Sequence, residues 1–108
     1  MLSKTQDFVI PVLQIVDSLG GRAWLPDIET SFFIRFGKDL DPKKDWHRMR
    51  PSRSRECWRD FCTTRVAYYF LRPQEYVTTE LHGASGAMYV LTDKGKAKAR
   101  EQLRAAGA

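Results

Sequence analysis

The apolar residues between positions 53 and 72 recur at helical spacing. The stripe that they form, at intervals of three and four residues, comprises Trp58, Cys62, Val66 and Tyr69 and is widened by Phe61 and Phe70. Such spacing predicts an amphipathic helix with a broad apolar face, which we expect to form the centre of a small core. Ser52 or Ser54 can cap its first turn, and Pro73 ends it.

Two shorter helices are predicted before this central one. The first covers residues 8–19, with Asp7 as its N-cap and with an apolar stripe of Phe8, Val12, Ile15, Val16 and Leu19. The second begins at Pro26 and ends at Gly37, and its predicted buried face is Ile28, Phe32, Phe33 and Phe36. Between them, residues 22–24 are predicted to form a short strand.

The segment from Asp41 to the central helix contains few apolar residues. Asp41 followed by Pro42 predicts a short helical turn that carries Lys43, Lys44 and Trp46. Residues 47–55 have no apolar periodicity, and we expect them to form a surface loop.

After the central helix the pattern becomes that of a β-hairpin. Residues 75–81 and 87–91 are rich in β-branched and aromatic side chains, and the glycines at 83 and 86 suit the turn between them. Thr92 then caps a last helix over residues 93–104, whose narrow apolar stripe contains Ala97 and Leu103.

This order of elements predicts one α+β, mainly helical domain over residues 1–108. Three core helices followed by a hairpin and a C-terminal helix form a winged helix-turn-helix domain, with the hairpin as the wing. The predicted core comprises Phe8, Val12, Val16, Leu19, Ile28, Phe32, Phe33, Trp58, Cys62, Val66 and Tyr69.

Composition adds limits on location. A hydrophobic share of 43% is that of a globular protein. No apolar run approaches the roughly 20 residues that span a bilayer. Asp7, Gln14 and Asp17 interrupt the apolar N-terminal segment, which argues against a signal peptide. We therefore expect a cytoplasmic protein that does not bind membranes.

Positive charge is concentrated in the middle of the chain. Residues 43–72 contain nine bases and three acids, a net charge of +6, whereas the whole chain carries +5. A basic segment on an otherwise neutral domain indicates a polyanionic partner. The alternative is a solvated loop whose arginines only keep the protein soluble.

No catalytic or metal-binding motif is present. Cys57 and Cys62 would lie about 140° apart around a helix, and His47 and His82 are isolated. The acids that could assist a nuclease lie mostly at helix starts, and no lysine is spaced to support them. We therefore expect no enzyme activity, no metal and no cofactor.

The basic segment and the hairpin supply the candidate contacts to double-stranded DNA. The face of the central helix opposite Cys62 is predicted to be exposed, with Arg59 at its border and with Glu56 and Asp60 contacting cytosine or orienting arginines. The candidate DNA-binding residues are Arg48, Arg50, Arg53, Arg55, Arg59, Thr63, Thr64, His82 and Ser85.

Three runs of the sequence resemble the N-terminal winged-helix domain of Mrr-type restriction proteins. They are VIPVLQIVDSLGGRAWLPDIETSFFIRFG, CWRDFCTTRVAYYFLRPQEYV and GAMYVLTDKGKAKAR, and the matching positions are Pro11, Leu13, Phe36, Gly37, Trp58, Leu91, Thr92 and Gly95. The resemblance implies recognition of duplex DNA, with modified DNA as one option, in a restriction, defence or regulatory setting. The arginine-rich loop departs from the family pattern. No nuclease domain follows Gly95, so the family's cleavage activity is not expected.

A second class of function is a protein-binding winged helix, such as an adaptor, a dimerisation partner or an anti-defence inhibitor. Large aromatic residues outside the core favour protein interfaces, and the candidates here are Trp24, Trp46, Tyr68 and Leu71. Tyr68 and Leu71 could equally pack under the wing. A homodimer through the last helix is a further option, opposed by the five bases along that helix.

Overall fold

The first helix is entered through a 3-10 turn. In the computed structural model, which describes residues 1–50 and 55–107, η1 (Thr5–Phe8) leads directly into α1 (Val9–Ser18). Asp7 does not cap α1 as predicted, because its Oδ2 accepts the backbone N–H groups of Ser3 and Lys4 at 3.0 and 2.9 Å and so closes the start of η1. Several residues of α1 are completely buried, namely Val12, Leu13, Ile15 and Val16.

A three-stranded antiparallel sheet joins distant parts of the chain. The predicted strand β1 (Arg22–Trp24) pairs with β5 (Ala87–Leu91), which also pairs with β4 (Val77–Leu81), so the strand order is β1-β5-β4. The predicted hairpin is confirmed, with Val77 opposite Leu91 and Leu81 opposite Ala87. Its turn contains η5 (Gly83–Ser85) and a positive φ of 99° at Gly86.

Helix α2 (Leu25–Phe36) begins and ends close to the predicted positions, with Pro26 in its first turn. Its buried face is Ile28, Glu29 and Phe32, not the wholly apolar face that was predicted. Gly37 then opens a short 3-10 turn, η2 (Gly37–Asp39).

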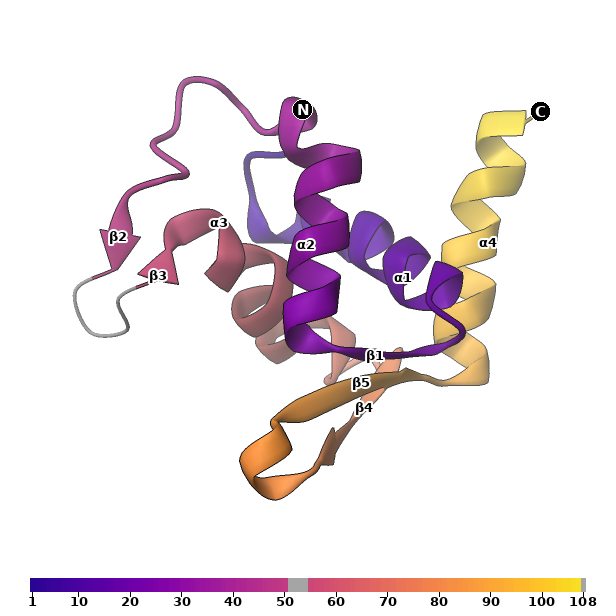
Figure 1. Cartoon of the computed structure of the whole chain (residues 1–108). Coiled ribbons are helices and arrows are strands. Elements are labelled where there is room, and N and C mark those ends of the chain that lie inside the picture. The colour runs from indigo at the N-terminus through magenta and orange to yellow at the C-terminus, as the bar shows by residue number, and fades with distance from the viewer. Residues whose placement is uncertain (51–54, 108) are drawn as a thin grey trace.

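The segment between α2 and the central helix is not the helical turn and loop that were predicted. Residues 42–47 form turns, in which Asp41 Oδ1 accepts the N–H of Lys43 at 3.0 Å and Trp46 Nε1 donates to the carbonyl of Asp41 at 2.8 Å. These bonds satisfy the Asp41 side chain and the indole N–H of Trp46 within the segment, and the Trp46 ring is buried. Beyond the turns, β2 (Met49–Arg50) pairs with β3 (Arg55–Glu56) to form what we call the arm. Figure 1 shows it beside α3, on the opposite side of the molecule from α4.

The central helix begins at Cys57, directly after β3, and not at residue 53. It consists of α3 (Cys57–Arg59), η3 (Asp60–Arg65), Val66 and η4 (Ala67–Leu71), and both η3 and η4 are hydrogen-bonded as π-helix. Glu56 occupies its N-cap position. The predicted caps Ser52 and Ser54 lie outside the described residues.

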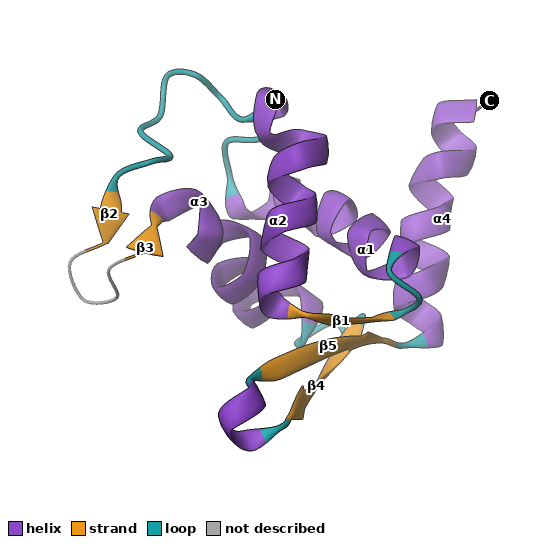
Figure 2. Cartoon of the chain, in the orientation of Figure 1, coloured by secondary structure: helices purple, strands orange, loops and turns teal. Residues whose placement is uncertain are grey.

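The last helix, α4 (Asp93–Gly107), starts as predicted, because Thr92 Oγ1 accepts the N–H of Gly95 at 3.0 Å. It packs against α1, and Figure 2 shows it running away from the end of β5. Ala99, not Ala97, is its buried alanine. No helix in the described ranges is both long and apolar enough to cross a membrane.

Eight of the predicted core residues are buried, and three are not. Leu19, Phe33 and Tyr69 are substantially exposed, whereas Leu71 is completely buried. The hydrogen bonding of the central helix explains why Tyr69 is exposed and Leu71 is buried. Its π-helical hydrogen bonds place more residues in each turn than the 3.6 of an α-helix, so by the end of the helix the buried position has moved from residue 69 to residue 71.

Candidate nucleic-acid interface

Much of the face of the central helix that was predicted to read DNA is turned inward. Asp60, Thr63 and Ala67 are only 3%, 1% and 1% exposed. Thr63 donates a hydrogen bond to the carbonyl of Arg59 at 2.8 Å, and its own carbonyl accepts the hydroxyl of Tyr89 at 2.6 Å. The prediction that Thr63 faces a DNA groove is therefore wrong, because α2 and the sheet cover that side of the helix.

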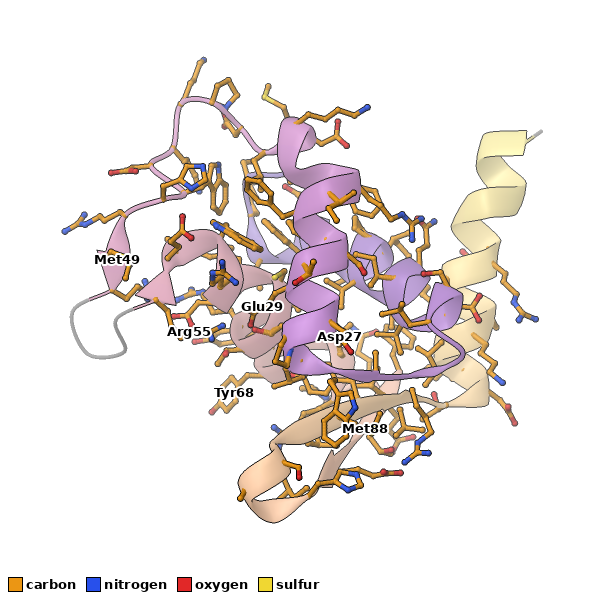
Figure 3. The ribbon with its side chains drawn as sticks, in the orientation of Figure 1. Asp27, Glu29, Met49, Arg55, Tyr68 and Met88 are labelled. Atoms are coloured by element: carbon orange, nitrogen blue, oxygen red, sulfur yellow. The ribbon has the colours of Figure 1, made fainter. Side chains whose placement is uncertain are left out.

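A buried carboxylate on α2 organises this inward face. Glu29 is 4% exposed, and its two oxygens accept hydrogen bonds from Arg55 Nη2 at 2.5 Å and Arg59 Nη1 at 3.1 Å. Figure 3 shows Arg55 and Glu29 close together, the first on the arm and the second on α2. The position of Glu29 near a helix start suggested only a favourable charge, so its pairing role was missed.

Asp60 forms the second half of the same network. Its carboxylate lies 2.9 Å from Arg50 Nε and 3.4 Å from Arg55 Nε. Arg50 and Arg55 belong to the two strands of the arm, so these ion pairs hold the arm against the central helix. This supports the view that the acids orient arginines, and it means that Arg50, Arg55 and Arg59 all have internal partners.

Glu56 contacts two neighbouring side chains, His47 and Arg59. His47 Nδ1 lies 2.6 Å from one carboxylate oxygen and Arg59 Nε 3.5 Å from the other. The hydrogen bond from His47, assisted by the charge of Arg59, lowers the pKa of Glu56 below its ordinary value. Of the two options left open for Glu56, contact with cytosine or orientation of an arginine, the observed contact with Arg59 matches the second.

The solvent side of the central helix carries cationic and aromatic groups. We call it the outer face, and it comprises Thr64, Arg65, Tyr68 and Tyr69, with Arg72 at the helix end. Tyr68 and Tyr69 are 66% and 55% exposed, and Figure 3 shows Tyr68 projecting away from the body. Since Asp60 is the only acid between residues 57 and 72 and is buried, no carboxylate of this segment reaches the outer face.

Arg65 is the best-placed cation of the outer face. Its guanidinium lies 5.0 Å from the centre of the Phe61 ring and 5.7 Å from that of Tyr69, so two aromatic rings hold it. Its Nε is buried and has no hydrogen-bond acceptor among the described residues. The guanidinium is therefore held in place without being neutralised by a described carboxylate.

A groove of about 630 Å³ opens between the turns before β2 and the central helix. Four basic and one acidic side chain line it together with apolar ones, in the order Lys44, Asp45, Trp46, Arg48, Met49, Arg50, Cys57, Phe61 and Arg65. We call it the basic groove. Arg65 belongs both to this groove and to the outer face, so the two surfaces are continuous.

The hairpin β4–β5 carries two of the candidate contact residues, and one of them already has partners within the protein. His82 and Ser85 are exposed at the hairpin turn, as predicted. However, His82 Nε2 lies 2.9 Å from Glu80 Oε1, an atom that also pairs with Arg22 at 2.6 Å. The ring of His82 further packs edge-on against Trp24. Ser85 is therefore the freer of the two candidates.

A smaller recess of about 250 Å³ lies on the other side of the arm, between α2 and the helix start. Its aromatic wall explains why Phe33 is not in the core: the ring packs on Trp58 at 4.9 Å and against His47 at 5.9 Å, at the surface. The recess adds no charged group that is free of the pairs described above.

The buried thiol and phenol of the core, and the distribution of possible metal ligands, can be described from the structure. Burial raises the pKa of the Cys62 thiol, which keeps it protonated and unreactive. Burial also raises the pKa of Tyr89 to about 12. Within residues 1–50 and 55–107, no three histidine, cysteine or acidic side chains gather to hold a metal ion.

The structure thus divides the nine predicted contact residues into groups. Arg48, Thr64, His82 and Ser85 reach the surface, Arg50, Arg55 and Arg59 are paired internally, Thr63 is buried, and Arg53 lies outside the described residues. The central helix also presents Arg65, Tyr68, Tyr69 and Arg72 at its solvent side, which the list of DNA-binding candidates did not contain. Their signal was the stretch of basic and aromatic residues at the end of the central helix, which was assigned partly to the core.

Comparisons with known proteins add nothing to these geometric observations. The chain matches no protein-family model, no curated protein and no solved structure.

Proposed function

We propose that this chain is a winged helix-turn-helix protein that binds duplex DNA through the outer face of its central helix. The observation that carries the proposal is the composition of this face, which presents two arginines and two exposed tyrosines and no carboxylate. A surface of this kind attracts the phosphate backbone, whose charge supplies much of the affinity of DNA-binding proteins.

The arrangement of elements supports the same proposal. The central helix follows two shorter helices, and the hairpin β4–β5 follows the central helix. In a winged helix-turn-helix domain such a helix enters the major groove while the wing lies along the neighbouring backbone. The sheet order β1-β5-β4 ties the wing to the helical core, which suits a wing that must keep a fixed position beside the helix.

The arginines and tyrosines of the outer face each have a chemical role in this proposal. Arg65 can donate two parallel hydrogen bonds to guanine O6 and N7, and its contacts with Phe61 and Tyr69 preorganise it for that task. Arg72 and the tyrosine hydroxyls can bind phosphate oxygens, which fix the position of the protein on the duplex.

The paired arginines have a different role here. Arg50, Arg55 and Arg59 hold the arm and the helix start in place through Glu29 and Asp60. They support the DNA-binding surface without themselves reading bases. The resemblance to Mrr-type winged-helix domains agrees with this proposal as far as fold and DNA recognition are concerned.

Fluorescence anisotropy with labelled random duplex DNA tests the proposal. We expect salt-dependent binding by the wild type, and weaker binding by Arg72→Ala and Tyr68→Ala at all sequences. Lys38→Ala is the matched control, since Lys38 is exposed on η2. Absence of binding by the wild type at low salt, or equal losses in all three variants, would show that the outer face is not a DNA-binding surface.

One observation favours the alternative of a protein-binding module. Tyr68 and Tyr69 are adjacent, exposed and packed edge to face at 5.0 Å, as interface aromatics are. Of the other candidates for this function, Trp46 and Leu71 are buried and Trp24 packs on His82. A wild type that binds no DNA would make these two tyrosines the starting point for a protein partner.

A further inference from the structure

We propose that the basic groove binds an unpaired, phosphate-bearing nucleotide segment of DNA, such as a single-stranded tail that adjoins the duplex on the outer face. This inference rests on the proposed function and adds to it the class of DNA that is bound. Single-stranded sites combine a positively charged groove with aromatic or apolar side chains on which bases pack, and both features are present here.

The charge of the groove suits phosphate. Lys44, Arg48, Arg50 and Arg65 face a single acid, Asp45. Two of the four cations already have partners, because Arg50 pairs with Asp60 and Lys44 Nζ donates to the carbonyl of Ser3 at 2.6 Å. Arg48 is exposed and forms no ion pair with any described residue, so its guanidinium is open to an anion. Arg65, half-buried, adds positive charge at the end of the groove that adjoins the outer face.

The apolar lining suits a base. Cys57, Phe61 and Arg65 are spaced by four along the central helix and form one wall. The Phe61 ring is fixed by an edge-on contact with the buried ring of Trp46 at 5.0 Å. Opposite, Met49 is 53% exposed on β2, and a long, flexible thioether side chain adapts readily to a planar ligand.

The size and position of the groove favour a single strand over a duplex. Its volume of about 630 Å³ lies within the range of small-ligand sites, on the order of 300–1,000 Å³, and therefore fits a nucleotide but not a double helix. Arg65 links the groove to the outer face, so a strand that leaves a duplex bound there can continue into the groove without a gap in positive charge.

The experiment compares two labelled DNAs by fluorescence anisotropy: a blunt duplex, and the same duplex with a short single-stranded tail. We expect the wild type to bind the tailed DNA about tenfold more tightly, as base packing in such sites predicts. Binding of the blunt duplex reports on the proposed function, and the difference between the two DNAs reports on the groove.

Two variants locate the effect. Arg48→Glu reverses a charge at the groove, Met49→Ser removes part of its apolar lining, and Lys38→Glu is the control with the same charge change elsewhere. Each replaced side chain is exposed, so all three variants are expected to fold. Arg48→Glu and Met49→Ser should lose the preference for the tail, while Lys38→Glu keeps it.

The outcomes separate the two proposals. Equal affinity of the wild type for both DNAs, with the blunt duplex bound, would overturn the groove inference and leave duplex binding intact. A preference that survives in both groove variants would place the tail elsewhere and also overturn it. If the wild type binds neither DNA, the proposed function fails and the inference fails with it.

Discussion

Gly95, in the first turn of α4, lies closer to the preceding chain than any other residue type would permit. A Cβ atom at this position would be 2.0 Å from the carbonyl oxygen of Tyr76 and 3.1 Å from the side chain of Leu91. The absence of a side chain therefore allows α4 to start directly against the end of the sheet.

Gly95→Ala is accordingly expected to destabilise the protein by about 1–3 kcal/mol, the usual cost of overpacking. Gly37→Ala is the control, because Gly37 has an ordinary helical φ and a Cβ there would make contacts of 3.4 Å or more with the Phe33 ring. Urea denaturation measures both variants. Similar stabilities for the two would contradict the close approach at Gly95.

Asp7 gives the second prediction at this scale. The backbone N–H groups of Lys4 and Ser3 lower the pKa of its carboxyl below the ordinary value of 3.8. A lowered pKa stabilises the fold above the unfolded-state pKa, and this contribution is lost as the pH falls through the folded-state pKa. Asp7→Ala should therefore cost about 1 kcal/mol near neutral pH and progressively less in acid.

Thermal unfolding followed across the acidic range checks this dependence. Gln6→Ala, an exposed neutral position in the same turn, should differ from the wild type by an amount that does not change with pH. If the stability lost in Asp7→Ala also does not change with pH, the carboxylate does not act as the cap of η1.

At the scale of the element, a network of ion pairs connects the central helix with α2 and the arm. Glu29 is the only carboxylate of α2 that is buried in the described structure, and it receives Arg55 and Arg59. Removing one member of a buried pair leaves the others desolvated and uncompensated. Because both arginines are partly exposed, we expect Glu29→Gln to cost about 2 kcal/mol, less than a fully buried pair.

Chemical denaturation of Glu29→Gln, with Glu101→Gln on the exposed side of α4 as control, measures that cost. The variant should also loosen the arm, which hydrogen exchange at residues 49, 50, 55 and 56 would detect. Unchanged exchange in these residues would mean that Asp60 alone suffices to hold the arm.

At the level of elements, the sequence predicted most of what the structure contains. The four main helices, the first strand, the hairpin and the cap at Thr92 were found from local patterns, because periodicity and capping are local properties. The helical turn predicted after Asp41 was wrong, and the short strands β2 and β3 were not predicted. Two features did not follow from these patterns. The π-helical turns shift the buried positions toward Leu71, and the partners of Glu29 lie 26 to 34 residues away.

The same dependence on the folded structure explains the errors in the predicted DNA-binding site. An arginine in a basic run looks available for DNA until its partner is known. Arg55 pairs with Glu29 on α2, and Arg50 pairs with Asp60 on the central helix. Arg65 and Arg72 lie in the same run but have no paired carboxylate in the described structure, and only the folded chain distinguishes these two groups.

At the scale of the whole molecule, the difference between paired and unpaired arginines predicts how DNA affinity depends on salt concentration. Affinity for duplex DNA should fall with salt at a log–log slope of about −0.9 per phosphate contacted. Arg72→Ala should reduce the magnitude of the slope by about 1. Arg55→Ala should instead lower the melting temperature and leave the slope unchanged, since its guanidinium serves Glu29 and Asp60.

Anisotropy titrations at several salt concentrations, together with calorimetry of the same variants, provide the measurement. A flatter slope for Arg55→Ala without loss of stability would assign Arg55 to the DNA and break the proposed division of the arginines.

The pairing of β1 with β5 has a consequence for how the protein is made. Arg22 lies opposite Val90 and Trp24 opposite Met88 in the sheet. During synthesis, β1 leaves the ribosome well before β5 and cannot pair until β5 has been made. Closing so long a loop is slow, and until then the backbone of β1 is an open edge that can pair with other chains. The nascent chain therefore depends on β5 to complete the sheet, and a premature stop before residue 87 would leave both β1 and β4 without their partner strand.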